Sequence, residues 1–344
     1  MKKIFLGLVL LLIIGGGIIV WLFLGAATGF SSSKEVLYIR THAATRQAVL
    51  DSLHKNKIIT NTSTFNWLAR QLDLWKRLKP GKYDIKKGSS VLSIVRMLRN
   101  GRQTPVNLVI TKLRTKEDLA RLTGNKFEFD SLQMIAFLNN NDSLQKFDVD
   151  SATAMSIILP DTYTYFWNTT PSLVFKKWND ESKKYWTGSR KQKAQQHGLT
   201  PTQVYILASI IEEETTNNAE KGTIASVYLN RMKIGMPLQA DPTVKFALKD
   251  FGLKRIYEKH TQVESAYNTY RNKGLPPGPI CTPSKKTIEA VLNAPQTSYL
   301  YFVARPDVRE THDFSETYEE HLKKARSYHL ELNRRDSANQ AQTK

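Results

Sequence analysis

The chain has 344 residues, of which 41% are apolar, 24% are charged and 10% are aromatic. This length can bury one or two cores of ordinary size, so a small disulfide-stapled module is excluded, and the composition excludes wholesale disorder. The single cysteine, Cys281, rules out an intramolecular disulfide framework and a zinc site built from several cysteines. The formal net charge of +19 is strongly basic.

The N-terminus carries 24 uncharged residues from Ile4 to Ala27. As a helix this stretch is about 36 Å long, which is enough to cross a bilayer. Lys2 and Lys3 precede it, so the positive-inside tendency places residues 1–3 in the cytoplasm and the rest of the chain outside. A cleaved signal peptide is the alternative, although its apolar core is usually only about 7–15 residues. We therefore predict a single-pass anchor at 4–27 in the lipid bilayer of the cytoplasmic (inner) membrane.

A small α/β unit is predicted over residues 36–110, after a short polar segment at 28–35 that is expected to be a flexible linker. Its predicted elements are a strand at Val36–Arg40, helices at Thr45–Leu53 and Phe65–Leu74, and a strand after the Pro80-Gly81 turn. Ser90 is expected to cap a further helix, which Asn100-Gly101 ends.

A connecting region is predicted over 111–154, with short helices at Thr115–Leu122 and Ser131–Leu138 and a loop at 139–142. The composition becomes aromatic and apolar from Ala154, and we place a larger domain at 155–332, followed by a polar tail at 333–344. The expected fold class is α+β, with the small unit at 36–110 and the larger domain at 155–332.

The clearest helix start in the chain is Thr200-Pro201-Thr202-Gln203. Thr200 fits the N-cap, Pro201 the first helical position, and Gln203 completes a capping box. Apolar residues cover more than half the circumference of the helix from Val204 to Ile211, which predicts a largely buried helix.

Three consecutive acids, Glu212, Glu213 and Glu214, end this helix and point about 100° apart. Burial, mutual repulsion and the helix dipole all favour the neutral acid, and a raised pKa suits a general acid. An ordinary exposed acidic helix end is the plain alternative. Helix geometry alone does not choose among the three glutamates.

Other chemistries find little support in the sequence. The seven histidines include no i,i+4 pair, and neither a Gly-x-Ser-x-Gly elbow nor a P-loop is present, so no metal ion or other cofactor is expected. Nucleic acid is not an expected partner, because the chain has no nucleic-acid-binding motif and lies outside the membrane. Two stiff loops, 235–243 and 267–280, offer amide, carboxylate and phenol groups of the kind that hold sugars, although each residue could equally serve its own turn.

Together these segments resemble the YceG/MltG family of membrane-anchored endolytic murein transglycosylases. The resemblance covers nearly the whole chain, including a LysM-like unit at 36–110. It is carried by Leu207–Thr215, Ala225–Met232, Ile234–Val244, Tyr267–Tyr270, Gly274–Ile280 and Tyr299–Val303, with His312 and Phe314 close behind. Two segments depart from the family pattern, Ile110–Leu113 and Met155-Ser156, and both lie outside the catalytic signature.

The resemblance implies that Glu212 is the catalytic acid of a lytic transglycosylase. Such an enzyme cuts the MurNAc–GlcNAc β-1,4 bond of nascent peptidoglycan strands without water, leaves 1,6-anhydroMurNAc ends and so limits strand length. By the same resemblance, Gln239, Asp241, Asn268 and Tyr270 bind sugar hydroxyls and acetamido groups, or shape the site. The implied partners are glycan strands and peptidoglycan synthases. A non-catalytic wall-binding scaffold is the alternative function.

Overall fold

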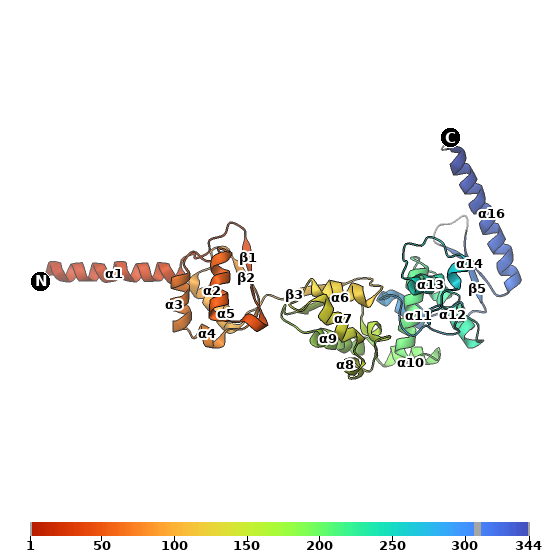
Figure 1. The fold of residues 1–344 in the computed structure, drawn as a ribbon, viewed down its shortest axis with the longest axis horizontal. Coiled ribbons are helices and arrows are strands. Elements are labelled where there is room, and N and C mark those ends of the chain that lie inside the picture. Colours follow the sequence, from red (N-terminus) through yellow and green to blue (C-terminus); the bar gives the residue numbers. More distant parts are fainter. Residues whose placement is uncertain (1, 306–310, 343–344) are drawn as a thin grey trace. The chain divides into compact units, whose positions relative to one another are not determined.

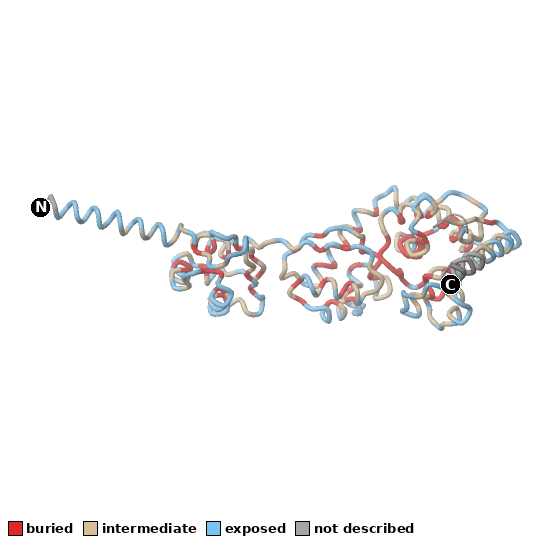
Figure 2. The backbone as a smooth tube through the Cα atoms, turned by 90° about the horizontal axis from the view of Figure 1, so that it is seen from above, coloured by how far each residue is buried: buried red, intermediate tan, exposed pale blue. Residues whose placement is uncertain are grey.

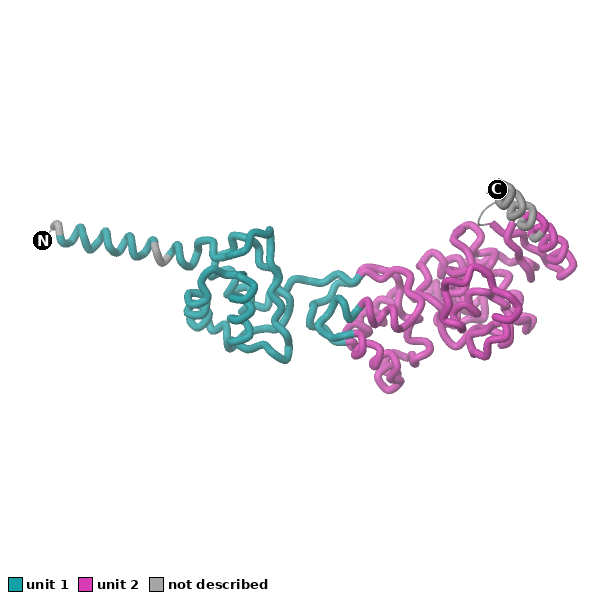
Figure 3. The backbone as a smooth tube through the Cα atoms, turned by 45° about the horizontal axis from the view of Figure 1, so that its top comes forward, with its two compact units in different colours: residues 1–108, 123–130, 163–170 teal, residues 109–122, 131–162, 171–344 magenta. Residues whose placement is uncertain are grey.

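The computed structural model describes residues 2–305 and 311–342. It is a mixed α+β structure that is mostly helical, and its described residues form three two-stranded sheets (Figure 1). The chain divides into two compact units (Figure 3). Unit 1 comprises residues 1–108, 123–130 and 163–170, and unit 2 comprises residues 109–122, 131–162 and 171–344.

The N-terminal helix α1 (Lys2–Leu24) belongs to unit 1. Its segment Ile4–Leu24 is long and apolar enough to cross a membrane, and none of it is buried within the protein. By its length and composition, this segment fits either a single-pass anchor or a signal sequence.

The rest of unit 1 is built around an antiparallel pair of strands. Its elements up to residue 100 are β1 (Lys34–Ile39), the 3₁₀ turn Thr41–Ala43, α2 (Arg46–Lys55), α3 (Thr62–Gln71), α4 (Leu74–Arg77), β2 (Gly81–Lys86) and α5 (Val91–Asn100). β1 pairs with β2 from Lys34 opposite Lys86 to Ile39 opposite Gly81. The inward side chains of this pair, Leu37, Tyr83 and Ile85 among them, pack in one core with α2, α3 and α5.

The ends of α5 confirm the sequence prediction. The Ser90 side chain accepts a hydrogen bond from Ser93 N, and Gly101 closes the helix at a φ of 63°, a left-handed conformation that glycine adopts without strain.

The expected flexible linker at 28–35, in contrast, is partly ordered. Thr28 forms a β-bridge with Ile59, Gly29 N donates to Ile58 O, and β1 already begins at Lys34.

The rest of the chain is mainly helical and belongs to unit 2, except for residues 101–108, 123–130 and 163–170, which take in parts of β3, α6 and β4 and belong to unit 1. From β3 to the C-terminus the elements are β3 (Val106–Ile110), α6 (Lys116–Gly124), α7 (Ser131–Asn139), α8 (Asn141–Gln145), the 3₁₀ turn Ala154–Ile157, β4 (Asp161–Tyr165), α9 (Pro171–Tyr185), α10 (Gly188–Gln196), α11 (Pro201–Glu214), α12 (Lys221–Lys233), α13 (Asp241–Leu248), α14 (Glu258–Thr261), α15 (Lys285–Leu292), β5 (Tyr301–Ala304), β6 (His312–Ser315) and α16 (Tyr318–Gln342). β3 pairs with β4, and β5 with β6.

Helix α11 supplies more residues than any other helix to a hydrophobic core of unit 2. Figure 2 marks the buried stretches of the backbone in red. Every residue from Val204 to Ile211 is buried, and α11 packs against α12, α13 and α15. The predicted capping box is confirmed, because Gln203 N donates to Thr200 Oγ1 (3.2 Å) and Thr200 N donates to Gln203 Oε1 (2.9 Å). The cap fixes the start of α11 and the packing fixes its orientation, and together they determine where the acidic cluster lies.

Three segments differ from the predicted pattern. The loop at 139–142 gives way to α8, because Asn140 accepts a hydrogen bond from Ser143 N and starts a helix. The loop 235–243 ends in the first turn of α13, where Pro242 fits without loss of a hydrogen bond. The expected tail at 333–344 continues α16 through Gln342, since it is rich in residues of good helix propensity, and 343–344 lie outside the described residues.

We predict that Thr200→Ala lowers the free energy of unfolding by about 1 kcal/mol, because it leaves N–H groups at the start of α11 without a partner. Urea unfolding followed by tryptophan fluorescence measures the change. Thr187→Ala is the matched control, since Thr187 is the N-cap of α10 but makes no side-chain cap bond. An equal loss in both variants would contradict the role assigned to the cap.

Candidate active site

The last turn of α11 sends its three carboxylates into three different surroundings. Its preceding residues are buried without exception from Val204, so the helix cannot rotate to bring the acids to water. The turn ends at Thr215, which leaves the helical conformation. Each glutamate must therefore be accommodated by the groups that surround it.

Glu212 lies in a closed polar network between three helices. Its Oε2 is 3.0 Å from Lys221 Nζ on α12 and also accepts hydrogen bonds from Ser284 Oγ (3.1 Å) and Thr287 Oγ1 at the start of α15. The Lys221 side chain is only 5% exposed and the Glu212 side chain 16% exposed. Lys221 donates to Thr287 Oγ1 (2.7 Å) as well, so this carboxylate joins α11, α12 and α15.

Glu213 faces two cations that come from the segment before α6. Lys112 Nζ lies 2.9 Å from its Oε1, and an Arg114 guanidinium nitrogen lies 2.9 Å from its Oε2. Burial raises the pKa of Glu213, but the hydrogen bonds and charges of Lys112 and Arg114 outweigh it and hold the pKa below its usual value. Glu213 is therefore a carboxylate at neutral pH, unsuited to give up a proton.

Glu214 is held as the neutral acid. Burial, followed by the nearby charge of Asp241, raises its pKa to about 8, although the Tyr228 hydroxyl and the charges of Lys245 and Arg231 offset part of this. The Glu214 carboxyl therefore keeps its proton at neutral pH, whereas that of Glu213 does not.

Two of the predicted sugar-binding residues lie beside this acid. The Tyr270 hydroxyl donates to Asp241 Oδ1 at 2.6 Å, and both residues contribute electrostatically to the surroundings of Glu214 or Tyr228. Burial and the Asp241 carboxylate raise the pKa of the Tyr270 phenol, so it stays a hydrogen-bond donor. The structure therefore brings Asp241, Tyr270 and Glu214 together.

The other two predicted sugar-binding residues, Asn268 and Gln239, make contacts with the backbone of neighbouring segments. Asn268 is fully buried, and its side-chain NH₂ group donates to Thr261 O and Val263 O, both at 2.8 Å. Its Oδ1 accepts from Tyr270 N at 3.0 Å, so its side chain shapes the loop that presents Tyr270. Gln239 is exposed at a left-handed φ of 52°, and its backbone N donates to Thr269 O.

The sequence did not single out Lys221 or assign Arg231 a definite role. Arg231 is 7% exposed and donates to Leu300 O (2.7 Å) and Leu238 O (2.6 Å), which fixes the loop before Asp241. Lys221 follows Glu212 by nine residues across a turn, so no helical periodicity connects them. Among the described residues, no group of three or more His, Cys, Asp or Glu side chains could hold a metal ion.

Fold and site together define an α+β protein with a carboxyl-lined site at the end of a buried helix. The model of the YceG-like family matches residues 37–327, and the chain belongs to this family. A curated relative from Bacillus subtilis (strain 168), named endolytic murein transglycosylase, is 29% identical over 304 residues, which cover 82% of this chain and 81% of the relative.

Two further comparisons agree with this assignment. A Streptococcus pneumoniae (strain ATCC BAA-255 / R6) protein of the same name is 27% identical over 77% of this chain, which spans only 53% of that relative's length. The crystal structure of a YceG-like protein from Listeria monocytogenes aligns with a TM-score of 0.54 at 26% identity, covering 85% of this chain and 99% of the Listeria chain.

We predict that Lys221→Met lowers the free energy of unfolding by about 3 kcal/mol, because it leaves the Glu212 carboxylate partly buried without its cation. Adding Glu212→Gln should recover part of the loss, with a coupling energy of about 1–3 kcal/mol in a double-mutant cycle. Lys323→Met is the control, since Lys323 pairs with Glu319 in an exposed i,i+4 contact and should change stability by less than about 0.5 kcal/mol. Strict additivity at Lys221 and Glu212 would contradict the network.

Proposed function

We propose that this protein is a lytic transglycosylase that cleaves the MurNAc–GlcNAc β-1,4 bond of nascent peptidoglycan strands and leaves 1,6-anhydroMurNAc ends, which limits strand length. The observation that carries the proposal is the hydrogen-bonded pair of Asp241 and Tyr270 next to Glu214, a carboxyl whose pKa is raised to about 8 by burial and by the charge of Asp241. Support comes from membership of the YceG-like family and from relatives named endolytic murein transglycosylase.

One carboxyl group suffices for this reaction. The acid gives its proton to the glycosidic oxygen as the bond to C1 breaks, and the C6 hydroxyl of the same MurNAc attacks C1. The carboxylate that remains then takes the C6 hydroxyl proton, so the catalytic group returns to its acid form. No water enters the product, whereas a hydrolase needs a second carboxylate for water or a covalent intermediate.

The contacts favour Glu214 over Glu212 as that acid. The resemblance of the sequence assigns the role to Glu212, but the Oε2 atom of Glu212 is already in contact with a buried ammonium and two hydroxyls of α12 and the start of α15. Glu214 instead keeps its proton and neighbours the predicted sugar-binding groups. We assign Glu214 the proton transfer and Glu212 the positioning of α12 and α15 around it.

The membrane is the proposed location. Helix α1 anchors the chain in the cytoplasmic membrane, and the residues that follow it lie outside, where the glycan strands are made. Lys2 and Lys3 account for two positive charges, so the exported part keeps a net charge of +17 that attracts anionic lipid and murein. Peptidoglycan synthases are the proposed protein partners.

Mass spectrometry of digested murein separates the two candidate acids. We expect Glu214→Gln to lose 1,6-anhydro products by at least about a thousandfold, because the amide cannot supply the proton, while Glu212→Gln keeps detectable anhydro products. Circular dichroism of both variants controls for folding. The reverse pattern would return the acid role to Glu212, and reducing ends that carry solvent oxygen would mean a hydrolase instead.

The pH dependence of cleavage offers an independent measurement. Because the neutral acid is the active form, kcat should fall about tenfold per pH unit above a pH of about 8, the pKa of Glu214. The raised pKa also means that the folded state holds this proton more tightly than the unfolded state. The contribution of Glu214 to stability is therefore complete below the ordinary carboxyl pKa of 4.5 and is lost as the pH rises through about 8.

Urea unfolding at pH 5 and pH 8 tests the same shift. Glu214→Gln should be more stable relative to wild type at pH 8 than at pH 5, whereas Glu316→Gln, an exposed acid, should show no such trend. A difference between Glu214→Gln and wild type that does not depend on pH would contradict the raised pKa.

A further inference from the structure

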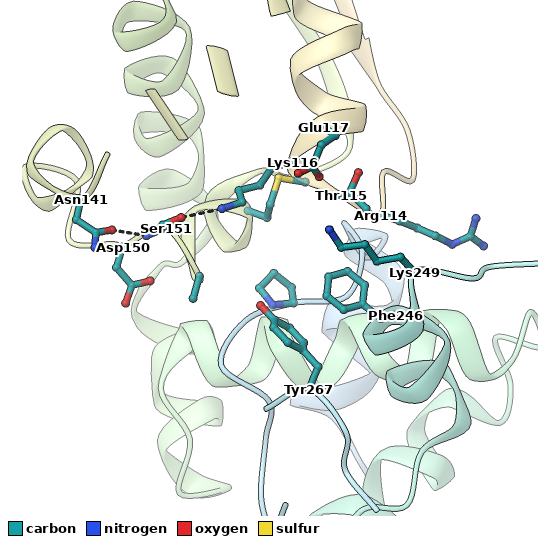
Figure 4. Close-up of a pocket in the computed structure, with 13 residues that line it drawn as sticks. Arg114, Thr115, Lys116, Glu117, Asn141, Asp150, Ser151, Phe246, Lys249 and Tyr267 are labelled. Atoms are coloured by element: carbon teal, nitrogen blue, oxygen red, sulfur yellow. Dashed lines mark hydrogen bonds between the residues drawn. The ribbon is translucent and has the colours of Figure 1, made fainter. Parts of the chain in front are cut away.

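A pocket of about 580 Å³ lies within unit 2 (Figure 4). One of its lining residues, Arg114, also pairs with Glu213 of the acidic cluster. The volume of the pocket is in the usual range for a ligand site. The lining residues come from the start of α6, the segments around Asn141 and 150–155, the end of α13, and the loop at Tyr267 and Pro279. None of the sugar-binding residues predicted from the sequence lines it.

Lys116 provides a partly buried cation in the wall of this pocket. Its Nζ donates to Asn139 Oδ1 (2.6 Å) and Ser151 Oγ (2.7 Å), which are both neutral acceptors. Within the described residues it makes no ion pair. Burial lowers the pKa of Lys116, as expected for an ammonium taken from water without a carboxylate in contact.

Lys249 supplies a second cation. It caps the C-terminus of α13 at a left-handed φ of 54°, and its ammonium group points into the pocket in Figure 4. It also makes no ion pair in the part of the chain that the structure describes. The two ammonium groups repel each other, which further lowers the pKa of Lys116.

The acids that line the pocket do not neutralise these cations by contact. Asp150 is exposed and its Oδ1 accepts hydrogen bonds from Thr153 N and Thr153 Oγ1. Glu117 is exposed at the rim. Both attract Lys116 from beyond ion-pair distance, so the interior of the pocket keeps positive charge available for an anion.

The pocket also has an apolar wall and adjoins the catalytic region. The Phe246 and Tyr267 rings lie 4.7 Å apart, centroid to centroid. Arg114 and Phe246 line both this pocket and a smaller one that contains Glu213. Asp241 begins the helix that carries Phe246 and Lys249, so the sugar-binding groups and the pocket share one rigid element.

We propose that this pocket binds the acidic peptide that substrate MurNAc units carry, with its carboxylates at Lys116 and Lys249 and its apolar side chains against Phe246 and Tyr267. The inference rests on the proposed function, since it assigns the peptide of the same substrate. A ligand with several carboxylates on a short, partly apolar chain matches two cations beside an aromatic wall. The pocket then favours peptide-bearing strands over bare glycan.

The test compares two substrates with the full chain in detergent micelles: glycan strands with their peptides, and the same strands stripped by an amidase. The measured quantity is the ratio of kcat/KM for peptide-bearing to stripped strands. We expect Lys249→Asn to lower this ratio about five- to tenfold, the usual effect of removing one hydrogen bond at an exposed side chain. Asparagine tolerates the left-handed backbone at this position, so the fold is kept.

Three further variants sharpen the comparison. Lys249→Arg retains the charge and should keep the wild-type ratio. Lys191→Ala, an exposed lysine on α10 remote from the lining residues, should also keep it. Lys116→Met should lower the ratio as Lys249→Asn does, with circular dichroism as a check that this less exposed site still folds. A ratio that is the same in wild type, Lys249→Asn and Lys116→Met would overturn the proposal and leave the proposed function intact.

A binding measurement separates failure of the pocket from failure of the enzyme. Calorimetric titration with a soluble disaccharide–pentapeptide should give a Kd about five- to tenfold weaker for Lys249→Asn than for wild type, even if neither strand substrate is cut. Loss of cleavage on both substrates by wild type would contradict the proposed function. Equal Kd values for wild type and Lys249→Asn would contradict the peptide pocket.

Discussion

The structure of the site depends on a single constraint, the rotation of about 100° per residue in a helix that cannot turn. Helix α11 is buried on all sides from Val204 to Ile211, so its last turn fixes where each carboxylate points. Three adjacent acids then need three separate solutions: a buried ammonium for Glu212, two basic side chains for Glu213 and a retained proton for Glu214. The third solution leaves a protonated carboxyl, to which we assign the role of the acid.

The remaining scaffold holds the groups that face this acid. The Arg231 side chain is buried, which is uncommon for arginine. Its guanidinium donates to the carbonyl groups of Leu238 and Leu300, which lie 62 positions apart in the sequence. Asn268 does the same for the next loop through three backbone contacts. The polar side chains of Arg231 and Asn268 therefore bond backbone groups and not a ligand. A buried loop needs such partners, because its N–H and C=O groups have no access to water. The loops that present Asp241 and Tyr270 are consequently rigid before any substrate arrives.

Local features of this fold were predictable from the sequence, and long-range partners were not. The capping box at Thr200 and Gln203 and the glycine stop at Gly101 follow from residues within one turn of each other, and the structure confirms both. The partners of Glu213, in contrast, come from 99 or more positions upstream, and those of Glu212 lie on α12 and α15.

Periodicity assigns a residue to a face of a helix but says nothing of the charge that another element brings to that face. The helical pattern therefore predicts where the acidic cluster lies but does not distinguish its three glutamates. For the same reason, the contacts of the Asn268 amide could not be predicted.

The two ionisable groups of unit 2 to which we propose a function in substrate contact, Glu214 and Lys116, have surroundings that disfavour their charged forms. Most buried ionisable groups here have a partner in contact, as Glu212 has in Lys221, and such pairs mainly hold elements together. Glu214, in contrast, is buried beside the Asp241 carboxylate. Lys116 is partly buried among the neutral acceptors Asn139 and Ser151. A folded chain tolerates this cost where a substrate supplies the missing interaction. The glycosidic oxygen would take the proton from Glu214, and a peptide carboxylate would pair with Lys116, so both costs would be relieved by different parts of one substrate.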